Sequence, residues 1–281
     1  MDEEVAFENY LYGDGKKIVI SNIDFCVDRI VMLPALRPLQ LERAVNLSIE
    51  LCQVTDFRRK LLEKYSECPV LMFRLYKQGI FSFESIKPFF HEVDAFMLCF
   101  YFRKEIKDFD QFIKINHGCS NIDSFFRSKY IPQTLSLFEK EKIIDQFVEF
   151  GFIPSSIEYY LKYDDIDAFL NIDFFDQNAQ WSRFEWSAKP KYLDLLSFSG
   201  FFGSIRCFKH LLMKGFEIND NVTYMIVCSG CLDLYHLCQG DLLFSPKCVI
   251  MASGFCHLSL FAFMIENGAN INSFTEKVDF S

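Results

Sequence analysis

Four thiol and imidazole side chains in the C-terminal third have a spacing that could bind a metal ion. Cys228 and Cys231 form a Cys-x-x-Cys pair, and His236 and Cys238 follow shortly after. Two thiolates at this spacing, with a further His or Cys nearby, are a common ligand set for structural zinc. Gly230 has a simpler explanation, a turn between two helices whose ends carry buried thiols. We favour buried thiols and predict no cofactor, and a metal- or thiol-dependent regulatory protein remains the alternative function.

Three aspartates, Asp164, Asp165 and Asp167, are the best candidates for acid–base chemistry. Paired carboxylates can share general acid and base roles, but these three stand at the start of an apolar stretch, Ile166 to Leu170. Aspartate at such a position caps the free N–H groups of a helix and suits its dipole. We therefore expect helix caps. Elsewhere no nucleophile, base and orienting group have workable spacing, so the sequence predicts that the protein is not an enzyme.

Two tryptophans, Trp181 and Trp186, lie in a connection over residues 171–191, between a helical region and a repeat-like one. A long connection within a compact array is often functional, and tryptophan is favoured at the centres of protein interfaces. The alternative is that the two rings fill a gap between neighbouring helices. Both interpretations are open from the sequence, and both tryptophans are candidate binding residues.

The composition argues against several classes of function. The chain has 281 residues, of which 51% are hydrophobic and 34 are phenylalanine, and its net charge is −9. Nucleic acid is a poor default partner, because phosphates need clustered Lys and Arg. The acidic first residues and the short longest apolar run, Ala95 to Phe102, argue against a signal peptide and a membrane span. The odd number of cysteines favours reduced thiols, so we predict a cytoplasmic protein without membrane insertion.

The pattern of elements is mainly helical. Two short apolar runs, residues 10–12 and 18–20, flank a Gly-Asp-Gly turn. They suggest a small β-hairpin within an N-terminal β or irregular segment, residues 1–38. Over residues 39–170, apolar side chains recur at helical spacing in short stretches, which predicts an irregular helical-repeat domain.

Several predicted helices end in a glycine. Each glycine follows an apolar stretch and precedes a short hydrophobic bend and a polar helix start. Glycine there supplies the left-handed conformation that closes the last turn. After one of them, Ser155 and Glu158 have the spacing of a capping box. The four glycines are Gly79, Gly151, Gly215 and Gly268.

The C-terminal part, residues 192–281, divides into similar units. Gly203, Gly230 and Cys256 occupy equivalent turns between a first and a second helix, with steps of 27 and 26 residues. Such a period is typical of stacked repeats, because one helix pair cannot bury its own apolar faces. The expected fold is therefore all-α, a solenoid of helical hairpins.

The segment from Leu195 to Asn219 resembles an ankyrin repeat. It has a small residue before the turn, a glycine at the turn, the pair Leu211-Leu212, and Gly and Asn near its end. The last unit, with His257-Leu258 and an ending from Ile265 to Asn272, is closer still. An ankyrin unit has 33 residues and begins with Thr-Pro-Leu-His. Here the period is shorter and that tetrapeptide is absent.

Taken whole, the chain resembles divergent ankyrin-like proteins with a helical N-terminal domain of unknown function, a family expanded in parasitic protists. The stretches 155–165 and 181–187 carry this wider resemblance. The resemblance implies ankyrin-like repeats in the C-terminal third. Because the units leave little room for projecting β-hairpin fingers, binding through such fingers is not expected to transfer.

We predict a non-catalytic scaffold or adaptor for protein–protein interaction. Stacked helix pairs offer an extended surface whose exposed residues can vary while the core persists. The acidic excess between Glu158 and Asp176 favours a basic surface on the protein partner. Besides the two tryptophans, the candidate binding residues are polar or aromatic residues beside the bends: Asp194, Asp220, Asn221, Tyr224, Asp241, Lys247, Asn270 and Asn272.

Overall fold

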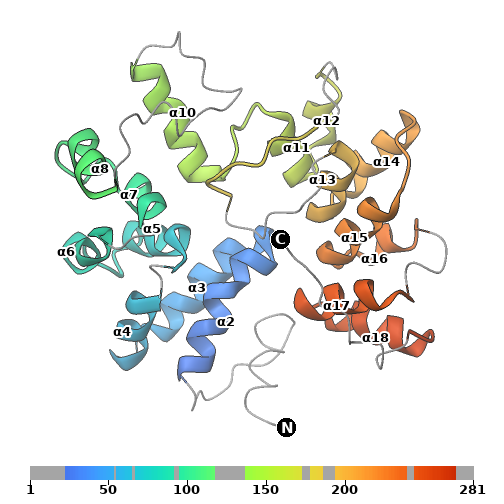
Figure 1. The fold of residues 1–281 in the computed structure, drawn as a ribbon, viewed down its shortest axis with the longest axis horizontal. Coiled ribbons are helices and arrows are strands. Elements are labelled where there is room, and N and C mark those ends of the chain that lie inside the picture. Colours follow the sequence, from blue (N-terminus) through green and yellow to red (C-terminus); the bar gives the residue numbers. More distant parts are fainter. Residues whose placement is uncertain are drawn as a thin grey trace. The chain divides into compact units, whose positions relative to one another are not determined.

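The computed structural model describes residues 23–53, 55–64, 67–91, 95–117, 137–172, 178–185, 194–238 and 244–269 (Figure 1). Within these ranges every regular element is a helix, and the β contact is an isolated bridge between Asn178 and Asp194. The all-α class is therefore confirmed for the described part of the chain. The expected β-hairpin at residues 10–20 lies outside the described residues.

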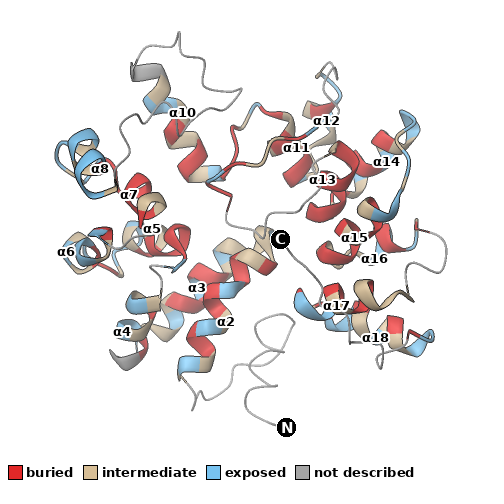
Figure 2. Cartoon of the chain, in the orientation of Figure 1, coloured by how far each residue is buried: buried red, intermediate tan, exposed pale blue. Residues whose placement is uncertain are grey.

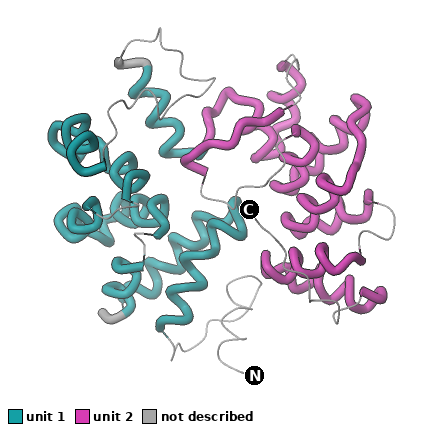
Figure 3. The backbone as a smooth tube through the Cα atoms, in the orientation of Figure 1, with its two compact units in different colours: residues 1–151 teal, residues 152–281 magenta. Residues whose placement is uncertain are grey.

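The chain divides into two compact units, residues 1–151 and 152–281 (Figure 3). From the sequence we expected boundaries near residues 38, 170 and 191 instead. The difference arises at α11 (Ile157–Tyr163), because this helix packs on α13 (Leu195–Phe202). Helix α11 thus belongs with the C-terminal helices rather than with the helical region that precedes it.

The first unit is a set of short helices. In chain order they are α2 (Ile23–Leu36), η1 (Pro38–Gln40), α3 (Leu41–Leu51), α4 (Thr55–Lys64), α5 (Pro69–Lys77), α6 (Phe83–Ile86), η3 (Lys87–His91), α7 (Phe96–Tyr101), α8 (Phe109–His117) and α10 (Leu137–Phe150). Helix α2 packs against α3 and α4. Helix α3 then packs against α5, and α5 against α7. Short amphipathic helices of this kind are stable because each buries one apolar face on its neighbours.

Helix α2 corrects the expectation that residues 1–38 are β or irregular throughout. Its buried side chains include Cys26, Val27, Ile30 and Val31, which recur at helical spacing. Pro34 suggested a break in the sequence, but it lies in the last turn of the helix. A proline there interrupts few hydrogen bonds, so the burial of an apolar face outweighs it.

The second unit contains four pairs of helices in its described ranges. The pairs are α11 with α12 (Ile166–Phe169), α13 with α14 (Ile205–Met213), α15 (Asp220–Ser229) with α16 (Leu232–Tyr235), and α17 (Pro246–Gly254) with α18 (Leu258–Glu266). The first helices pack in succession, α11 on α13, α13 on α15 and α15 on α17. Every residue of α13 is buried (Figure 2), as expected for a helix with neighbours on both sides.

The turns that the sequence indicated as equivalent share one backbone conformation. Gly203, Gly230 and Cys256 have φ angles of 69°, 67° and 55°, all in the left-handed region. Asp164, between α11 and α12, has a φ of 54° and makes a fourth such turn, which the glycine pattern did not reveal. The four glycines that end helices also have positive φ, as predicted: Gly79, Gly151, Gly215 and Gly268.

Candidate binding surfaces

Four of the predicted contact residues lie at the beginnings of α15 and α17. Asp220 is exposed in the first turn of α15 and is followed by the half-buried Asn221. Tyr224 lies one turn after Asp220, on the same face of the helix. On α17, the ammonium of Lys247 lies 3.9 Å from the centroid of the Tyr224 ring, a cation–π contact between neighbouring helix pairs. We call Asp220, Asn221, Tyr224 and Lys247 the α15–α17 patch.

Two other predicted contact residues have structural roles. Asp194 caps α13, because its carboxylate accepts a hydrogen bond from the backbone N–H of Ser197 at 2.9 Å. The ring of Trp181 packs on α13, with its centroid 5.7 Å from that of Phe198 and 5.9 Å from that of Phe202. These contacts of Trp181 fit the alternative in which its ring fills a gap between neighbouring helices. The remaining candidates, Trp186, Asp241, Asn270 and Asn272, lie outside the described residues.

A buried polar cluster, which the sequence did not indicate, holds the connection that carries Trp181. The ammonium of Lys162 lies 2.5 Å from the carboxylate of Glu185, and their side chains are 7% and 5% exposed. Glu158 is fully buried and accepts a hydrogen bond from the backbone N–H of Gln180 at 2.7 Å. Residues 178–185 are therefore attached to α11 at two points. A Glu and a Lys four residues apart are typical of a solvated helix face, so no sequence signal pointed to this burial.

The expected capping box at Ser155 is wrong. Ser156 is the capping residue of α11, since its hydroxyl accepts a hydrogen bond from the backbone N–H of Tyr159. Glu158, the expected partner in the box, instead bonds the connection at Gln180. The physical reason is the register: with Ser156 as the N-cap, the N3 position belongs to Tyr159, and Glu158 stands at N2, where a capping box has no acidic partner.

The three aspartates at 164, 165 and 167 are structural. Asp165 caps α12 by accepting from the N–H of Ala168, as predicted. Asp164 accepts hydrogen bonds from the N–H groups at the start of α14, and Asp167 forms an ion pair with Arg206 at 3.2 Å. With Glu158 buried, the described acids of this region are bound to other parts of the chain. They therefore give less support to a basic partner than the sequence suggested.

The structure does not bring the Cys-x-x-Cys pair together with His236 and Cys238 as a set of metal ligands. Cys228 and Cys238 are buried, whereas His236 is exposed with its ring near that of Phe263. Among the described residues, no group of three or more His, Cys, Asp or Glu side chains could hold a metal ion. Burial raises the pKa of the Cys228 and Cys238 thiols, which disfavours the thiolate that metals and oxidants need.

We expect protein purified from metal-containing medium to hold no stoichiometric zinc. Elemental analysis by mass spectrometry measures this directly, and exposure to a chelator should leave the helical circular dichroism signal unchanged. A structural zinc site would instead show about one metal per chain and a loss of helix with the chelator, because binding of a structural metal contributes to folding. The variant Cys231→Ser removes one half-buried thiol of the motif and serves as the control. Its zinc content and its helical signal should equal those of the wild type.

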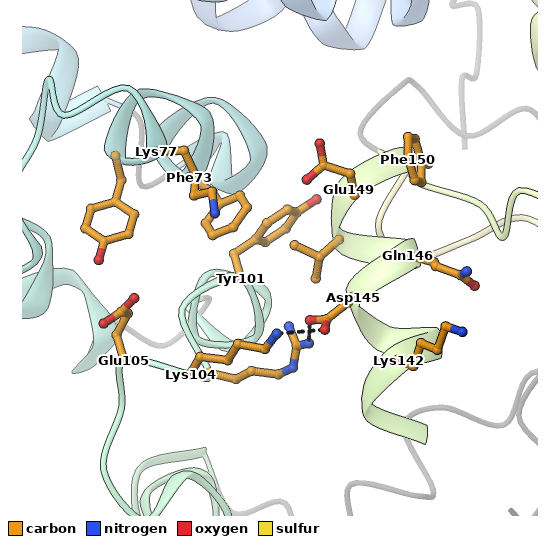
Figure 4. A pocket seen from close by; sticks show the side chains of 13 residues that line it. Phe73, Lys77, Tyr101, Lys104, Glu105, Lys142, Asp145, Gln146, Glu149 and Phe150 are labelled. Carbon is orange, nitrogen blue, oxygen red and sulfur yellow. Dashed lines mark hydrogen bonds and ion pairs between the residues drawn. The ribbon is translucent and has the colours of Figure 1, made fainter. Parts of the chain in front are cut away.

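The first unit contains a pocket between α5, the end of α7 and α10, with a volume of about 410 Å³. Figure 4 shows its side chains. Phe73, the buried Tyr101 and the buried Val148 give it an apolar lining, and the rings of Phe73 and Tyr101 have centroids 5.6 Å apart. The volume lies in the range of ligand-binding pockets. Its residues come from three separate segments that share no motif, which is why the sequence did not reveal it.

Ion pairs hold the wall of this pocket together. Arg103, whose side chain is 5% exposed, binds Glu141 and Asp145, and Lys104 binds Asp145 at 2.7 Å. Burial alone would raise the pKa of Asp145, but the two neighbouring cations outweigh burial and lower that pKa. From α5, Arg74 binds the Glu149 carboxylate at 2.7 Å and its carbonyl oxygen at 2.6 Å. Helix α10 is thus fixed to α5 and to the end of α7.

None of the described helices is both long and apolar enough to cross a membrane. Comparisons with protein-family models, with curated proteins and with solved structures found no match for this chain. The resemblance to ankyrin-like proteins consequently stays a prediction from the residues of the chain itself.

Proposed function

We propose that the protein is a non-catalytic scaffold that binds a protein partner on a solenoid of ankyrin-like helix pairs in its second unit. The observation that carries this proposal is the succession of α11, α13, α15 and α17, each packed on the next. Helix pairs stacked in this way form an extended surface. Exposed residues can then differ between pairs without loss of the core.

Contacts between successive turns support the stacking. The carboxylate of Asp164, in the first pair, accepts hydrogen bonds from the N–H groups of Arg206 and Cys207 in the second pair, at 3.0 and 2.8 Å. Further along, the imidazole Nε2 of His257 lies 2.6 Å from the carbonyl oxygen of Cys228 and donates to it. These bonds satisfy polar groups of one pair with groups of another, so they favour a fixed register between pairs.

The α15–α17 patch is the part of this surface that best fits a protein partner. Tyrosine is enriched at the centres of interfaces, because it offers a large contact area at a low cost in side-chain entropy. Tyr224 is already oriented by Lys247 of the next pair. Asp220, one turn away and exposed, adds a carboxylate that a cationic group of the partner can bind.

Capture of partners from the native cell tests the proposal. The double variant Tyr224→Ala/Lys247→Ala should lose at least one partner that the wild type retains, since loss of an interface tyrosine often weakens binding by more than about tenfold. The matched control is Lys209→Ala/Met213→Ala, which removes a lysine and a large apolar side chain from exposed positions of α14. Identical sets of partners for the wild type and the patch variant would contradict the proposed surface.

A further inference from the structure

The pocket of the first unit has a charge balance that differs from that of the whole chain. Two of its three carboxylates are engaged within the protein: Asp145 by Lys104 and Arg103, and Glu149 by Arg74. The third, Glu105, is exposed, and its negative charge adds to burial in raising the pKa of Tyr76. Most of the negative charge that lines the pocket is therefore already paired with cations of the chain.

Two lysines of the pocket have no such partner. In the described part of the chain, no carboxylate lies within ion-pair distance of Lys77 or Lys142, and both side chains are exposed. The ammonium of Lys77 lies 5.9 Å from the centroid of the Phe73 ring, at the edge of the apolar lining. In Figure 4, Lys77 points to this lining, whereas Lys142 points away from the ion pairs at Asp145. A cation available for binding thus lies beside an apolar surface, in a protein whose net charge is −9.

The shape of the pocket indicates the kind of ligand. Sites for small molecules usually enclose most of the ligand surface, but this pocket is only partly enclosed, and three of its lining side chains, Lys77, Glu105 and Lys142, are exposed. An open pocket suits one side chain of a larger partner, whose remaining atoms stay outside. The aromatic lining fits a ring or a branched aliphatic group, and Lys77 fits a carboxylate next to it.

We propose that this pocket is a docking site for an acidic peptide segment of a protein partner. One aromatic or branched aliphatic side chain of the segment packs on Phe73 and Tyr101, and a neighbouring Asp or Glu forms an ion pair with Lys77. Lys142 attracts acidic residues further along the segment. The site is separate from the α15–α17 patch and lies in the other unit, so the two proposals do not depend on each other.

Fluorescence anisotropy with the full-length protein tests this proposal. The probes are fluorescein-labelled peptides of Gly and Ser that carry one Leu, Ile, Phe, Tyr or Trp flanked by glutamates. Matched peptides have Lys in place of the glutamates, or Ser in place of the apolar residue. At least one acidic peptide should bind more tightly than both of its matched forms. The variant Lys77→Glu should weaken that binding by roughly tenfold or more, and added salt should weaken it as well.

The controls separate this site from the rest of the molecule. Lys209→Glu makes the same charge change at an exposed position of α14 and should leave the affinity unchanged. The double variant Tyr224→Ala/Lys247→Ala should also bind the peptide normally, so that failure of one proposal is distinct from failure of the other. The inference is overturned if no acidic peptide outperforms its lysine form, or if Lys77→Glu binds as the wild type does. Competition by free phenylacetate as strong as by the peptide would show a small-acid site instead.

Discussion

Replacement of Gly230 by alanine is expected to destabilise the second unit by about 2–5 kcal/mol. Gly230 has a φ of 67°, where an L-residue costs roughly 1–2 kcal/mol. A Cβ at this position would also overlap the imidazole ring of His257, which is buried and bonded to the carbonyl oxygen of Cys228. The ring cannot move aside without loss of that bond, so overpacking adds about 1–3 kcal/mol.

Urea unfolding followed by tryptophan fluorescence measures this loss, because both tryptophans of the chain belong to the second unit. Gly203→Ala is the matched control: Gly203 has nearly the same φ, 69°, but a Cβ there would meet no atom closer than 3.5 Å, an ordinary van der Waals contact. It should cost only the backbone contribution, about 1–2 kcal/mol. Equal losses for the two variants would show that the turn at Gly230 does not rest on His257, and would weaken the case for stacked pairs.

Comparison of these turns shows how far the sequence predicts the fold. Helical spacing of apolar residues placed the helices, and the register of the repeats placed a turn at Cys256 equivalent to those at Gly203 and Gly230. The structure gives all three turns the same left-handed conformation, although Cys256 is not a glycine. The sequence pattern does not predict the turn at Asp164, for two reasons. It carries no glycine, and the long connection with Trp181 separates it from the turn at Gly203 by more than the usual step. An inserted segment hides a period although the helices on either side still pack together.

The candidate sites were less predictable, because they depend on contacts between distant segments. The register did place Tyr224 and Lys247 beside the bends of two successive units, and these two residues are in contact. The pocket is different: Phe73, Tyr101 and Val148 come from three helical segments, and each by itself looks like an ordinary core residue. The charge pattern of α11 also gave a wrong expectation. Glu158 and Lys162 are spaced as on a solvated helix face, but both are buried.

Removal of the Glu185 carboxylate is expected to destabilise the second unit by about 3–5 kcal/mol. In Glu185→Ala the ammonium of Lys162 would stay buried without its partner, and an uncompensated buried charge is costly. Rings of Phe152 and Phe202, with centroids 5.7 and 5.8 Å from that ammonium, offset only part of the loss. The same urea unfolding measures the effect.

Two comparisons identify burial as the cause of this loss. Asp167→Ala breaks an ion pair with Arg206 in which both side chains are more than half exposed, and it should cost less than about 1 kcal/mol. The double variant Lys162→Met/Glu185→Leu should regain most of the stability, since an apolar pair of similar volume can replace a buried ion pair. If Glu185→Ala costs no more than Asp167→Ala, the connection is not fixed by this pair. Trp181 would then owe its position on α13 to the contacts of its own ring.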